Sequence, residues 1–429
     1  MTIAFYTLGC KVNTYETEAL QTLFKQDGFD VVDAKAFADV YVINTCTVTN
    51  TSDVKSRKAI RRAIKQNTDA VVAVIGCYSQ VESEVVAAID GVDIVMGTSQ
   101  REQLLTLVKQ YLRDRRQILA VNDITRYKTF DRLNVTSFSE NTRAFIKIQD
   151  GCNQYCSYCI IPFARGPIRS RPLENIVQEA QAMINKGYKE IVLTGIHTGG
   201  YGSDLENTSF YDLLSALNAL DNLKRLRISS VEINQLTDEI LTLMQSSATF
   251  ARHLHIPLQS GSNDILRKMK RRYTLDEYES KINHIRALMP DIAITTDIIV
   301  GYPEETDVDF ETIQRTVERI QFSELHVFPY SKRSGTKAAQ VKDQVHGTIK
   351  SMRVNTLIQT NEQLANAFID QSKSLTQSVL FERCDGEYCY GHTSHYLYIK
   401  VKTREALENT LHDVKIIEAS YPQSLAVFT

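Results

Sequence analysis

The chain has 429 residues, of which 43% are hydrophobic, and a formal net charge of −2. This length predicts two or three domains, and the composition is that of a globular protein rather than a disordered or fibrous one. No apolar run reaches the roughly 20 residues of a membrane span, and the N-terminus lacks the pattern of a secretory signal. Eight cysteines are too few for a disulfide scaffold. We therefore expect a cytoplasmic protein with no membrane partner, whose cysteines bind metal and whose nucleic-acid contacts, if any, come from local basic patches.

The first 125 residues alternate short apolar runs with helical periodicity, which predicts an α/β domain with an open parallel sheet. Three near-continuous apolar runs, typical of strands buried on both faces, each end at a cysteine: Ile3–Cys10, Val40–Cys46 and Ala70–Cys77. Because ligands bind beyond the carboxyl ends of parallel strands, Cys10, Cys46 and Cys77 should converge there. A cysteine is also a common small buried hydrophobe. Three in the same structural position favour an iron–sulfur cluster with one open corner.

The segment after Cys46 has six basic residues and no acidic one between Lys55 and Gln66. Four of them share one helical face: Lys58, Arg61, Arg62 and Lys65. Such a face suits a phosphate backbone, so we consider it a candidate RNA-binding surface. An ordinary solvated helix surface remains the simpler interpretation.

A linker is predicted between about residues 123 and 141, where periodicity is lost and Thr, Ser, Asn and charged residues dominate. Residues 138–372 then repeat a strand-then-helix unit. The six candidate strands are Ala144–Gln149, Glu190–Gly195, Arg225–Ser230, His253–Gln259, Ile292–Gly301 and Glu324–Ser331. Amphipathic segments between them include Leu173–Lys186, Leu275–Leu288 and Glu305–Ile320. Six units are too few for an eight-stranded barrel, so we predict a partial (β/α)6 barrel with its chemistry at the carboxyl ends of the strands.

The first of these strands leads into a loop with three cysteines, Cys152, Cys156 and Cys159, in the spacing C-x3-C-x2-C. Thiolates are soft ligands that hold iron–sulfur clusters. A four-iron cluster held by three thiolates leaves one iron open to a molecule that offers an amine and a carboxylate. S-adenosylmethionine (SAM) offers both and is a cofactor of radical chemistry. A zinc site would need further ligands at suitable spacing, and none follows.

Residues after the next three strands are candidates for contacting SAM. Gly199 and Gly200 follow the second strand, where a missing side chain lets a ligand approach the backbone. Glu232 follows the third strand and Gln259 the fourth, and both could bind polar parts of a nucleoside. A strand-to-helix turn also requires glycine, and buried polar side chains satisfied within the protein are the alternative. A second basic run, residues 267–272, lies near the same end of the barrel.

Residues 373–429 contain alternating and β-branched runs, which predict a small all-β domain. Its tyrosines could stack on bases or pack in the core: Tyr388, Tyr390, Tyr396 and Tyr398. Cys384 and Cys389 lie too close to His392 and His395 for a zinc finger. We expect these four to be ordinary residues near a turn.

The segment Gly151–Gly166 resembles the signature loop of the radical SAM methylthiotransferase family. The resemblance extends in the same order over the whole chain, through Thr7–Glu18, Ile43–Thr49, Gly76–Gln80, His253–Ser262 and Asp297–Thr306. Within the family, Leu8–Asn13 is most similar to the branch that modifies threonylcarbamoyladenosine beside the tRNA anticodon. The isopentenyladenosine branch more often has Gln-Met-Asn after this Gly-Cys pair.

The resemblance implies two [4Fe-4S] clusters, SAM, tRNA as a partner, and an electron donor of the flavodoxin or ferredoxin type. At the first cluster, held by Cys152, Cys156 and Cys159, SAM would yield a 5′-deoxyadenosyl radical that abstracts hydrogen from carbon 2 of the adenine. The second, auxiliary cluster at Cys10, Cys46 and Cys77 would supply a sulfur of unknown source, methylated by a second SAM. The base would leave its stack to reach the barrel. The resemblance also implies that residues 373–429 form a TRAM-like, OB-like β-barrel.

Three alternatives remain. Two are other branches of the family, acting on isopentenyladenosine in tRNA or on an aspartate of a ribosomal protein. The third is an iron–sulfur RNA-binding sensor of oxygen or iron. The basic segments favour RNA over a protein substrate, and the glycines at the barrel mouth argue against a sensor, which needs no SAM pocket.

Overall fold

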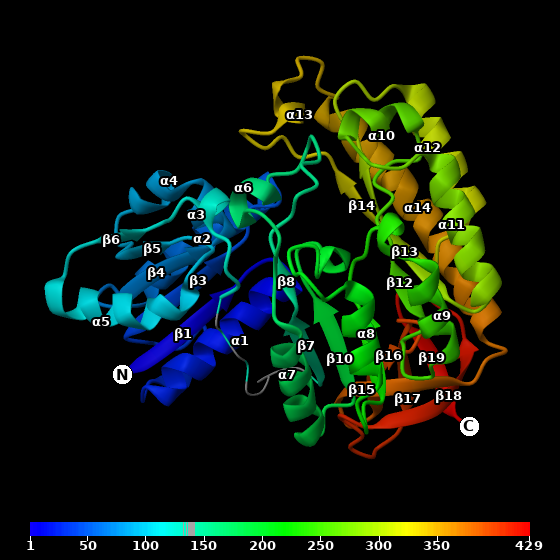
Figure 1. Ribbon diagram of the computed structural model, residues 1–429, viewed down its shortest axis with the longest axis horizontal. Helices are drawn as coiled ribbons and strands as arrows, with labels where there is room; N and C mark the ends of the chain where they lie inside the picture. Colours follow the sequence, from blue (N-terminus) through cyan, green and yellow to red (C-terminus); the bar gives the residue numbers. More distant parts are fainter. Residues whose placement is uncertain (132, 134, 136–141) are drawn as a thin grey trace.

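Six parallel strands form the N-terminal sheet, in the order β2-β1-β3-β4-β5-β6 (Figure 1). They belong to a computed structural model that describes residues 1–131, 133, 135 and 142–429. Every residue of β3 and β4 is buried, as expected for strands covered on both faces. The strands are β1 Thr2–Thr7, β2 Asp30–Val32, β3 Val40–Thr45, β4 Val71–Gly76, β5 Ile94–Met96 and β6 Ile118–Ala120. The helices are α1 Lys11–Gln26, α2 Asn50–Gln66, α3 Cys77–Val81, α4 Ser83–Ala87 and α5 Leu104–Asp114.

The predicted linker is only partly visible. Residues 124–126 form a short 3-10 helix within it. Residue 138, where we expected the second domain to begin, and residues 136–141 of the linker lie outside the described residues.

The central part is an open barrel of six parallel strands, which confirms the predicted architecture. Two three-stranded sheets, β11-β10-β7 and β12-β13-β14, are joined by isolated bridges between Leu226 and Phe250 and between Ser230 and His255. The strands are β7 Arg143–Lys147, β10 Glu190–Thr194, β11 Arg225–Ile228, β12 His253–His255, β13 Ala293–Val300 and β14 Glu324–Pro329. A small ribbon of β8 Gln149–Asp150 and β9 Arg169–Ser170 accompanies them.

Helices cover the outer face of this barrel (Figure 1). They are α7 Leu173–Asn185, α8 Phe210–Asn218, α9 Asp238–Ser246, α11 Leu275–Leu288, α12 Asp307–Ile320 and α14 Gly347–Ser372. The short helices α6 Ile161–Arg165, α10 Asn263–Met269 and α13 Lys337–Gln340 lie toward the carboxyl ends of the strands, and α6 packs against α3 (Figure 1). The capping boxes at Ser209, Thr274 and Thr306 fix the starts of α8, α11 and α12, because each side chain accepts a hydrogen bond from the first turn. Leu275–Leu288 matches the predicted segment at both ends.

One predicted strand is shorter than its apolar run. The run from His253 to Gln259 forms a strand only as far as His255. Pro257 has no N–H to donate to the ladder, and Gln259 has a positive φ of 70°. The chain returns to the sheet at Gln259 itself, through a single bridge to Ile298.

The C-terminal strands close into a five-stranded barrel in the order β15-β16-β17-β19-β18, which confirms the small β-barrel. They are β15 Gln377–Cys384, β16 Tyr388–Thr393, β17 Tyr398–Lys402, β18 Leu411–Glu418 and β19 Ser424–Phe428. Cys384 and Cys389 pair across the β15–β16 hairpin as a disulfide, so our expectation of ordinary turn residues was wrong. The antiparallel register of β15 and β16 places Cys384 opposite Cys389, and this register could not be predicted from the sequence.

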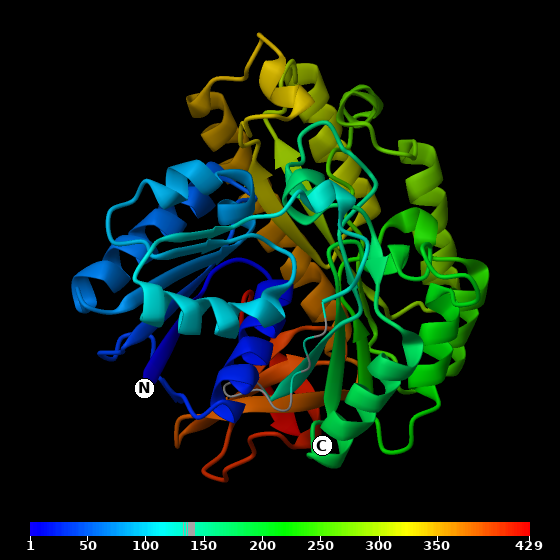
Figure 2. The same ribbon diagram turned by 60° about the vertical axis from the view of Figure 1, so that its left-hand side comes forward.

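The C-terminal barrel covers the amino-terminal ends of the central strands (Figure 1, Figure 2). Tyr396 stacks on His253, with 5.0 Å between ring centroids, and on His392 at 4.6 Å. Arg227 lies over the same tyrosine ring and donates a hydrogen bond to the carbonyl of Thr393. This end of the central barrel is therefore closed by the loop between β16 and β17. No helix among the described residues has the length and apolarity needed to cross a membrane.

A buried group of charges connects the N-terminal sheet to the central barrel. Glu16 of α1 accepts hydrogen bonds from Lys147 of β7 at 2.7 Å and from Arg165 of α6 at 2.5 Å. Asp150 lies 2.6 Å from Lys147 and 3.3 Å from Arg165. Burial alone raises the pKa of Glu16, but Arg101, Arg165 and Lys147 together lower it to about 2. Burial also raises the pKa of Asp150, but the charges of Lys147, Arg165 and Arg169 outweigh it and lower this pKa.

We predict that Glu16→Gln destabilises the metal-free protein at pH 7 by about 3 kcal/mol, because it leaves buried cations without their carboxylate. A carboxyl with a depressed folded-state pKa stabilises the protein above its unfolded-state pKa, near 4.5, and this stabilisation is lost as the pH falls toward 2. The free energy of unfolding of the wild type should therefore fall between pH 5 and pH 3 more steeply than that of the variant. Urea unfolding at several pH values measures both effects.

The matched control is Glu311→Gln, which removes an exposed ion pair with Arg315 on α12. It should change stability by no more than about 0.5 kcal/mol. Equal losses in the two variants would contradict a structural role for the buried charges.

Candidate functional site: two groups of cysteines

Cys10, Cys46 and Cys77 follow three strands that are adjacent in the N-terminal sheet, β1, β3 and β4. Cys10 precedes α1, and Cys77 is the first residue of α3. Gly9, with a φ of +105°, brings the β1 end close to the β3 end, since a Cβ on Gly9 would lie 3.1 Å from the Cys46 Sγ. The structure thus places the three predicted thiols at one edge of the sheet.

A guanidinium from the central barrel reaches this edge. Arg165 donates its Nε–H to the Cys77 Sγ at 3.1 Å and an Nη–H to the Asn13 Oδ1 at 2.6 Å. The Asn13 Oδ1 in turn lies 3.9 Å from the Cys10 Sγ. Burial raises the pKa of the Cys46 and Cys77 thiols, while the charge of Arg165 lowers the pKa of both. Three soft sulfurs beside a fixed cation are a donor set that fits an iron–sulfur cluster, whose ligands are thiolates.

Cys152, Cys156 and Cys159 lie on a loop with a fixed shape. A Cβ on Gly151 would lie 1.9 Å from the carbonyl oxygen of Pro167, so only glycine fits where the loop begins. Inside the loop, Ser157 lies 2.7 Å from the carbonyl oxygen of Lys268, to which its hydroxyl donates. Burial raises the pKa of Cys152 to about 11 and that of Cys159 to about 12. Cluster binding must therefore provide the free energy of deprotonation.

A second arginine, Arg271, lies beside this loop. Arg271 forms an ion pair with Glu232 and lies 3.6 Å from the Cys156 Sγ through its Nη1. We expected Glu232 to contact SAM, and the structure shows that its carboxylate is already paired beside the cysteine loop. Arg271 itself belongs to the predicted basic run 267–272, and its buried side chain lies beside the cysteine loop.

Gly199 and Gly200 lie in a short 3-10 helix, Thr198–Gly200, after β10. A Cβ on Gly199 would lie 2.2 Å from the Gln235 Oε1, and one on Gly200 would lie 2.6 Å from the His197 Nδ1. Both of these buried polar atoms lack a hydrogen-bond partner within the described residues. Buried polar groups are rarely left unpaired, so this glycine-lined surface fits a polar ligand such as SAM.

Two of the polar residues at this surface, His197 and Gln235, were not predicted from the sequence. The His197 Nε2 lies 2.8 Å from the Gln235 Nε2 and 3.3 Å from the Nε2 of Gln154, inside the cysteine loop. The position of His197 two residues before Gly199 was the available signal. Gln259, in contrast, forms backbone hydrogen bonds with strand β13. Its N–H donates to the Asp297 carbonyl at 2.8 Å, and its carbonyl accepts from the Ile299 N–H at 2.9 Å.

The four candidate RNA-binding residues, Lys58, Arg61, Arg62 and Lys65, are all exposed on α2. No ion pair involves any of them within the described part of the chain. The N-terminal end of this helix contacts the loop after β14, where Arg333 pairs with Asp53 at 2.6 Å. The basic face therefore lies on a helix anchored close to Cys46.

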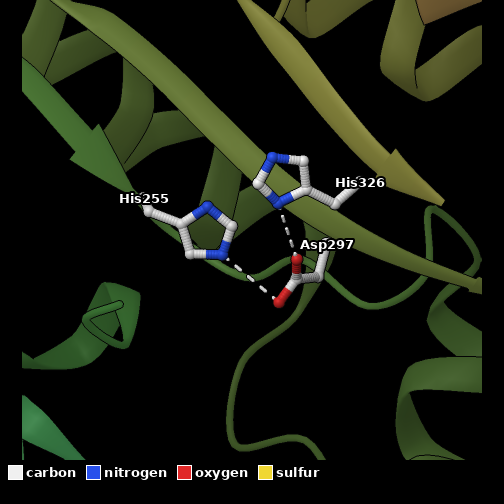
Figure 3. Close-up of side chains that lie close together, drawn as sticks. All are labelled: His255, Asp297 and His326. Carbon is white, nitrogen blue, oxygen red and sulfur yellow. Dashed lines mark ion pairs between the residues drawn. The ribbon is translucent and has the colours of Figure 1, made fainter. Parts of the chain in front are cut away.

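A further polar group, not predicted from the sequence, lies on the inner face of the barrel (Figure 3). Asp297 of β13 lies 3.2 Å from the His255 Nε2 and 3.3 Å from the His326 Nδ1. Burial raises the pKa of Asp297, but the two imidazoles outweigh this and lower it, and the hydrogen bond to Asp297 raises the pKa of His326. The three ligand atoms are close enough to hold a cation. Here Asp297 instead joins two histidines into one hydrogen-bonded wall.

Known proteins match this chain along its whole length. The model of the radical SAM superfamily matches residues 146–317, and that of the uncharacterized protein family UPF0004 matches residues 2–97. The threonylcarbamoyladenosine tRNA methylthiotransferase MtaB of Bacillus subtilis (strain 168) is 46% identical over 100% of this chain and 96% of its own. The tRNA-2-methylthio-N(6)-dimethylallyladenosine synthase of Thermoanaerobacter sp. (strain X514) is 34% identical over 96% of this chain and 89% of its own.

Among solved structures, the radical SAM methyltransferase TsrM from Kitasatospora setae, with cobalamin and a [4Fe-4S] cluster bound, superposes with a TM-score of 0.58. The match covers 79% of this chain and 76% of TsrM at 16% identity, which shows a shared fold alone. The sequence identity of 46% over the full length of a known methylthiotransferase shows the family as well as the fold. The chain belongs to the methylthiotransferase family of radical SAM enzymes.

Proposed function

We propose that this protein converts N6-threonylcarbamoyladenosine beside the tRNA anticodon to its 2-methylthio derivative. The observation that carries the proposal is the presence of two separate three-cysteine sites, on two domains, connected by Arg165. The substrate is assigned from the relative whose printed activity this is, which shares 46% identity, against 34% for the dimethylallyladenosine synthase. The three domains would be residues 1–125, 138–372 and 373–429.

Cys152, Cys156 and Cys159 would hold the first [4Fe-4S] cluster, and Gly199, Gly200, His197 and Gln235 would bind SAM next to it. When bound, this cluster would supply the electron for reductive cleavage of SAM. Arg271 places its positive charge and an N–H beside the Cys156 sulfur, and Glu232 holds the guanidinium in place. Gln154 connects the loop to His197, so the shape of the SAM-binding surface depends on the cysteine loop.

Cys10, Cys46 and Cys77 would hold the auxiliary cluster, which would supply the sulfur to be transferred. Arg165 donates a hydrogen bond to one of these sulfurs, and Asn13 orients the same guanidinium. The exposed cations Lys58, Arg61, Arg62 and Lys65 on α2 would contact tRNA phosphates near the auxiliary cluster. The reductant would be a flavodoxin- or ferredoxin-like protein, and the enzyme would act in the cytoplasm.

Two independent clusters predict a simple iron count. Replacing Cys152, Cys156 and Cys159 by Ala should lower the iron content from about eight to about four per chain, since each cubane holds four irons. Anaerobic reconstitution followed by iron analysis and EPR spectroscopy measures this. Replacing Cys384 and Cys389 by Ala is the matched control and should leave about eight irons. Complete loss of iron in the triple variant would contradict two separate sites.

Nucleoside analysis of tRNA tests the proposed substrate. In cells that lack this protein, we expect the 2-methylthio group to disappear from threonylcarbamoyladenosine and to remain on isopentenyladenosine. Expression of the wild-type gene should restore it, whereas a gene with Cys77→Ala should not. Loss from isopentenyladenosine instead would assign the protein to the other tRNA branch, and unchanged tRNA would contradict a tRNA substrate.

A further inference from the structure

The inner face of the central barrel is open to solvent although it lies inside the fold. His326 and Asp297, on neighbouring strands, have side chains that are 41% and 27% exposed, and Phe328 further along β14 is 45% exposed. The alternate residues Ile294, Ile298 and Leu325 are buried in the hydrophobic core on the other face of these strands. Tyr396 closes the amino-terminal ends of the central strands, and the cysteine loop lies at their carboxyl ends.

Lys11 faces this space from the N-terminal domain. It directly follows Cys10, and its Nζ lies 5.9 Å from the centroid of the Tyr396 ring. Arg143 and Arg227 also lie over this ring, at 5.7 and 4.8 Å. The Tyr396 ring in turn stacks on His253 of β12, with 5.0 Å between ring centroids. The Lys11 side chain therefore connects the auxiliary cysteine site to the inside of the barrel.

The charges around Tyr396 do not balance. Arg225 and Arg227 share the carboxylate of Glu190, at 3.0 and 2.7 Å. Arg143 pairs with Glu382 at 3.5 Å. Lys11 has no carboxylate within ion-pair distance anywhere in the described ranges. A cation held in such a partly buried position without an acidic partner is costly unless a bound anion supplies one.

The wall made by His255, Asp297 and His326 offers hydrogen-bonding groups, two imidazoles and the carboxylate that joins them (Figure 3). The Thr295 Oγ1 lies 2.8 Å from the His255 Nδ1 and fixes that ring. The His255 and His326 rings stack with 5.2 Å between centroids. The inner space thus combines one unpaired ammonium group with imidazole and carboxylate groups that can bind a hydroxyl or an amide.

We propose that Lys11 binds the carboxylate of the threonylcarbamoyl substituent of the substrate adenosine, while the His255–Asp297–His326 wall contacts the polar remainder of that substituent. This inference rests on the proposed function. The threonylcarbamoyl group carries a carboxylate, a hydroxyl and amide groups, whereas an isopentenyl group carries none of these. Lys11 is therefore a specificity-determining residue, and its position after Cys10 anchors the substituent beside the auxiliary cysteine site.

The test compares anticodon stem-loop RNAs that carry threonylcarbamoyladenosine, its carboxamide analogue, or isopentenyladenosine. The dissociation constant and the rate of 2-methylthio formation are measured with the enzyme holding both clusters. We expect the wild type to bind the acid at least about tenfold more tightly than the carboxamide, as a charge-assisted hydrogen bond provides. Lys11→Gln should bind the two equally, and Lys11→Arg should keep the preference.

Lys25→Gln, at the exposed far end of the same helix, is the matched control and should behave as the wild type. Iron analysis and EPR spectra establish that every variant holds both clusters. A Lys11→Gln variant that still prefers the acid over the carboxamide would overturn the inference and leave the proposed function intact. A wild type that modifies only the isopentenyl RNA would overturn the proposed function and the inference with it.

Discussion

The position of Arg165 is the constraint on which the arrangement of the two sites depends. It is fully buried and comes from α6, the helix that begins just after Cys159. Its guanidinium contacts Cys77, Asn13, Glu16 and Asp150, so one side chain joins the radical SAM loop to the cysteine edge of the N-terminal sheet. Burying this charge is costly, and the two carboxylates that accept from it offset the cost. The buried contacts of Arg165 thereby fix the position of the cysteine loop relative to the N-terminal sheet.

The two cysteine groups share one electrostatic design. Each has an arginine whose N–H points to a cysteine sulfur, Arg165 to Cys77 and Arg271 to Cys156. Each arginine is held by a glutamate, Glu16 in one case and Glu232 in the other. Hydrogen bonds and positive charge near the sulfurs are among the factors that set the reduction potential of an iron–sulfur cluster. The pairing of an arginine with an acid can therefore tune each cluster without adding net charge.

Much of this arrangement could be predicted from the sequence because it depends on local patterns. Apolar runs that end at Cys10, Cys46 and Cys77 are visible in the sequence, and parallel strands bring such ends together. Six strand-then-helix units were enough to predict an open barrel. Even the end of β12 had a local signal, since Pro257 lies in the run that was predicted to continue.

The contacts that were missed join residues far apart in the sequence. The pairing of Glu232 with Arg271 spans 39 positions, and that of Arg165 with Glu16 spans 149. The amino-acid types at these four positions do not indicate which residues pair. His255, Asp297 and His326 occupy alternate strand positions whose common inner face is set by the register of β12, β13 and β14. The proposed role of Lys11 likewise depends on the C-terminal domain, whose Tyr396 ring lies 5.9 Å from the Lys11 Nζ.

The reduction potential of the auxiliary cluster tests the central role of Arg165 most directly. It can be measured by EPR-monitored titration in protein whose Cys152, Cys156 and Cys159 are replaced by Ala, so that only the second cluster contributes. Replacing Arg165 by Gln removes both the charge and the N–H donated to Cys77, and we expect a clear shift to more negative potential. Replacing Arg169 by Gln should produce a smaller shift, because among the described residues Arg169 bonds to Arg165, Pro167 and Asp150 and to no cysteine. An unchanged potential in the Arg165→Gln protein would contradict the account.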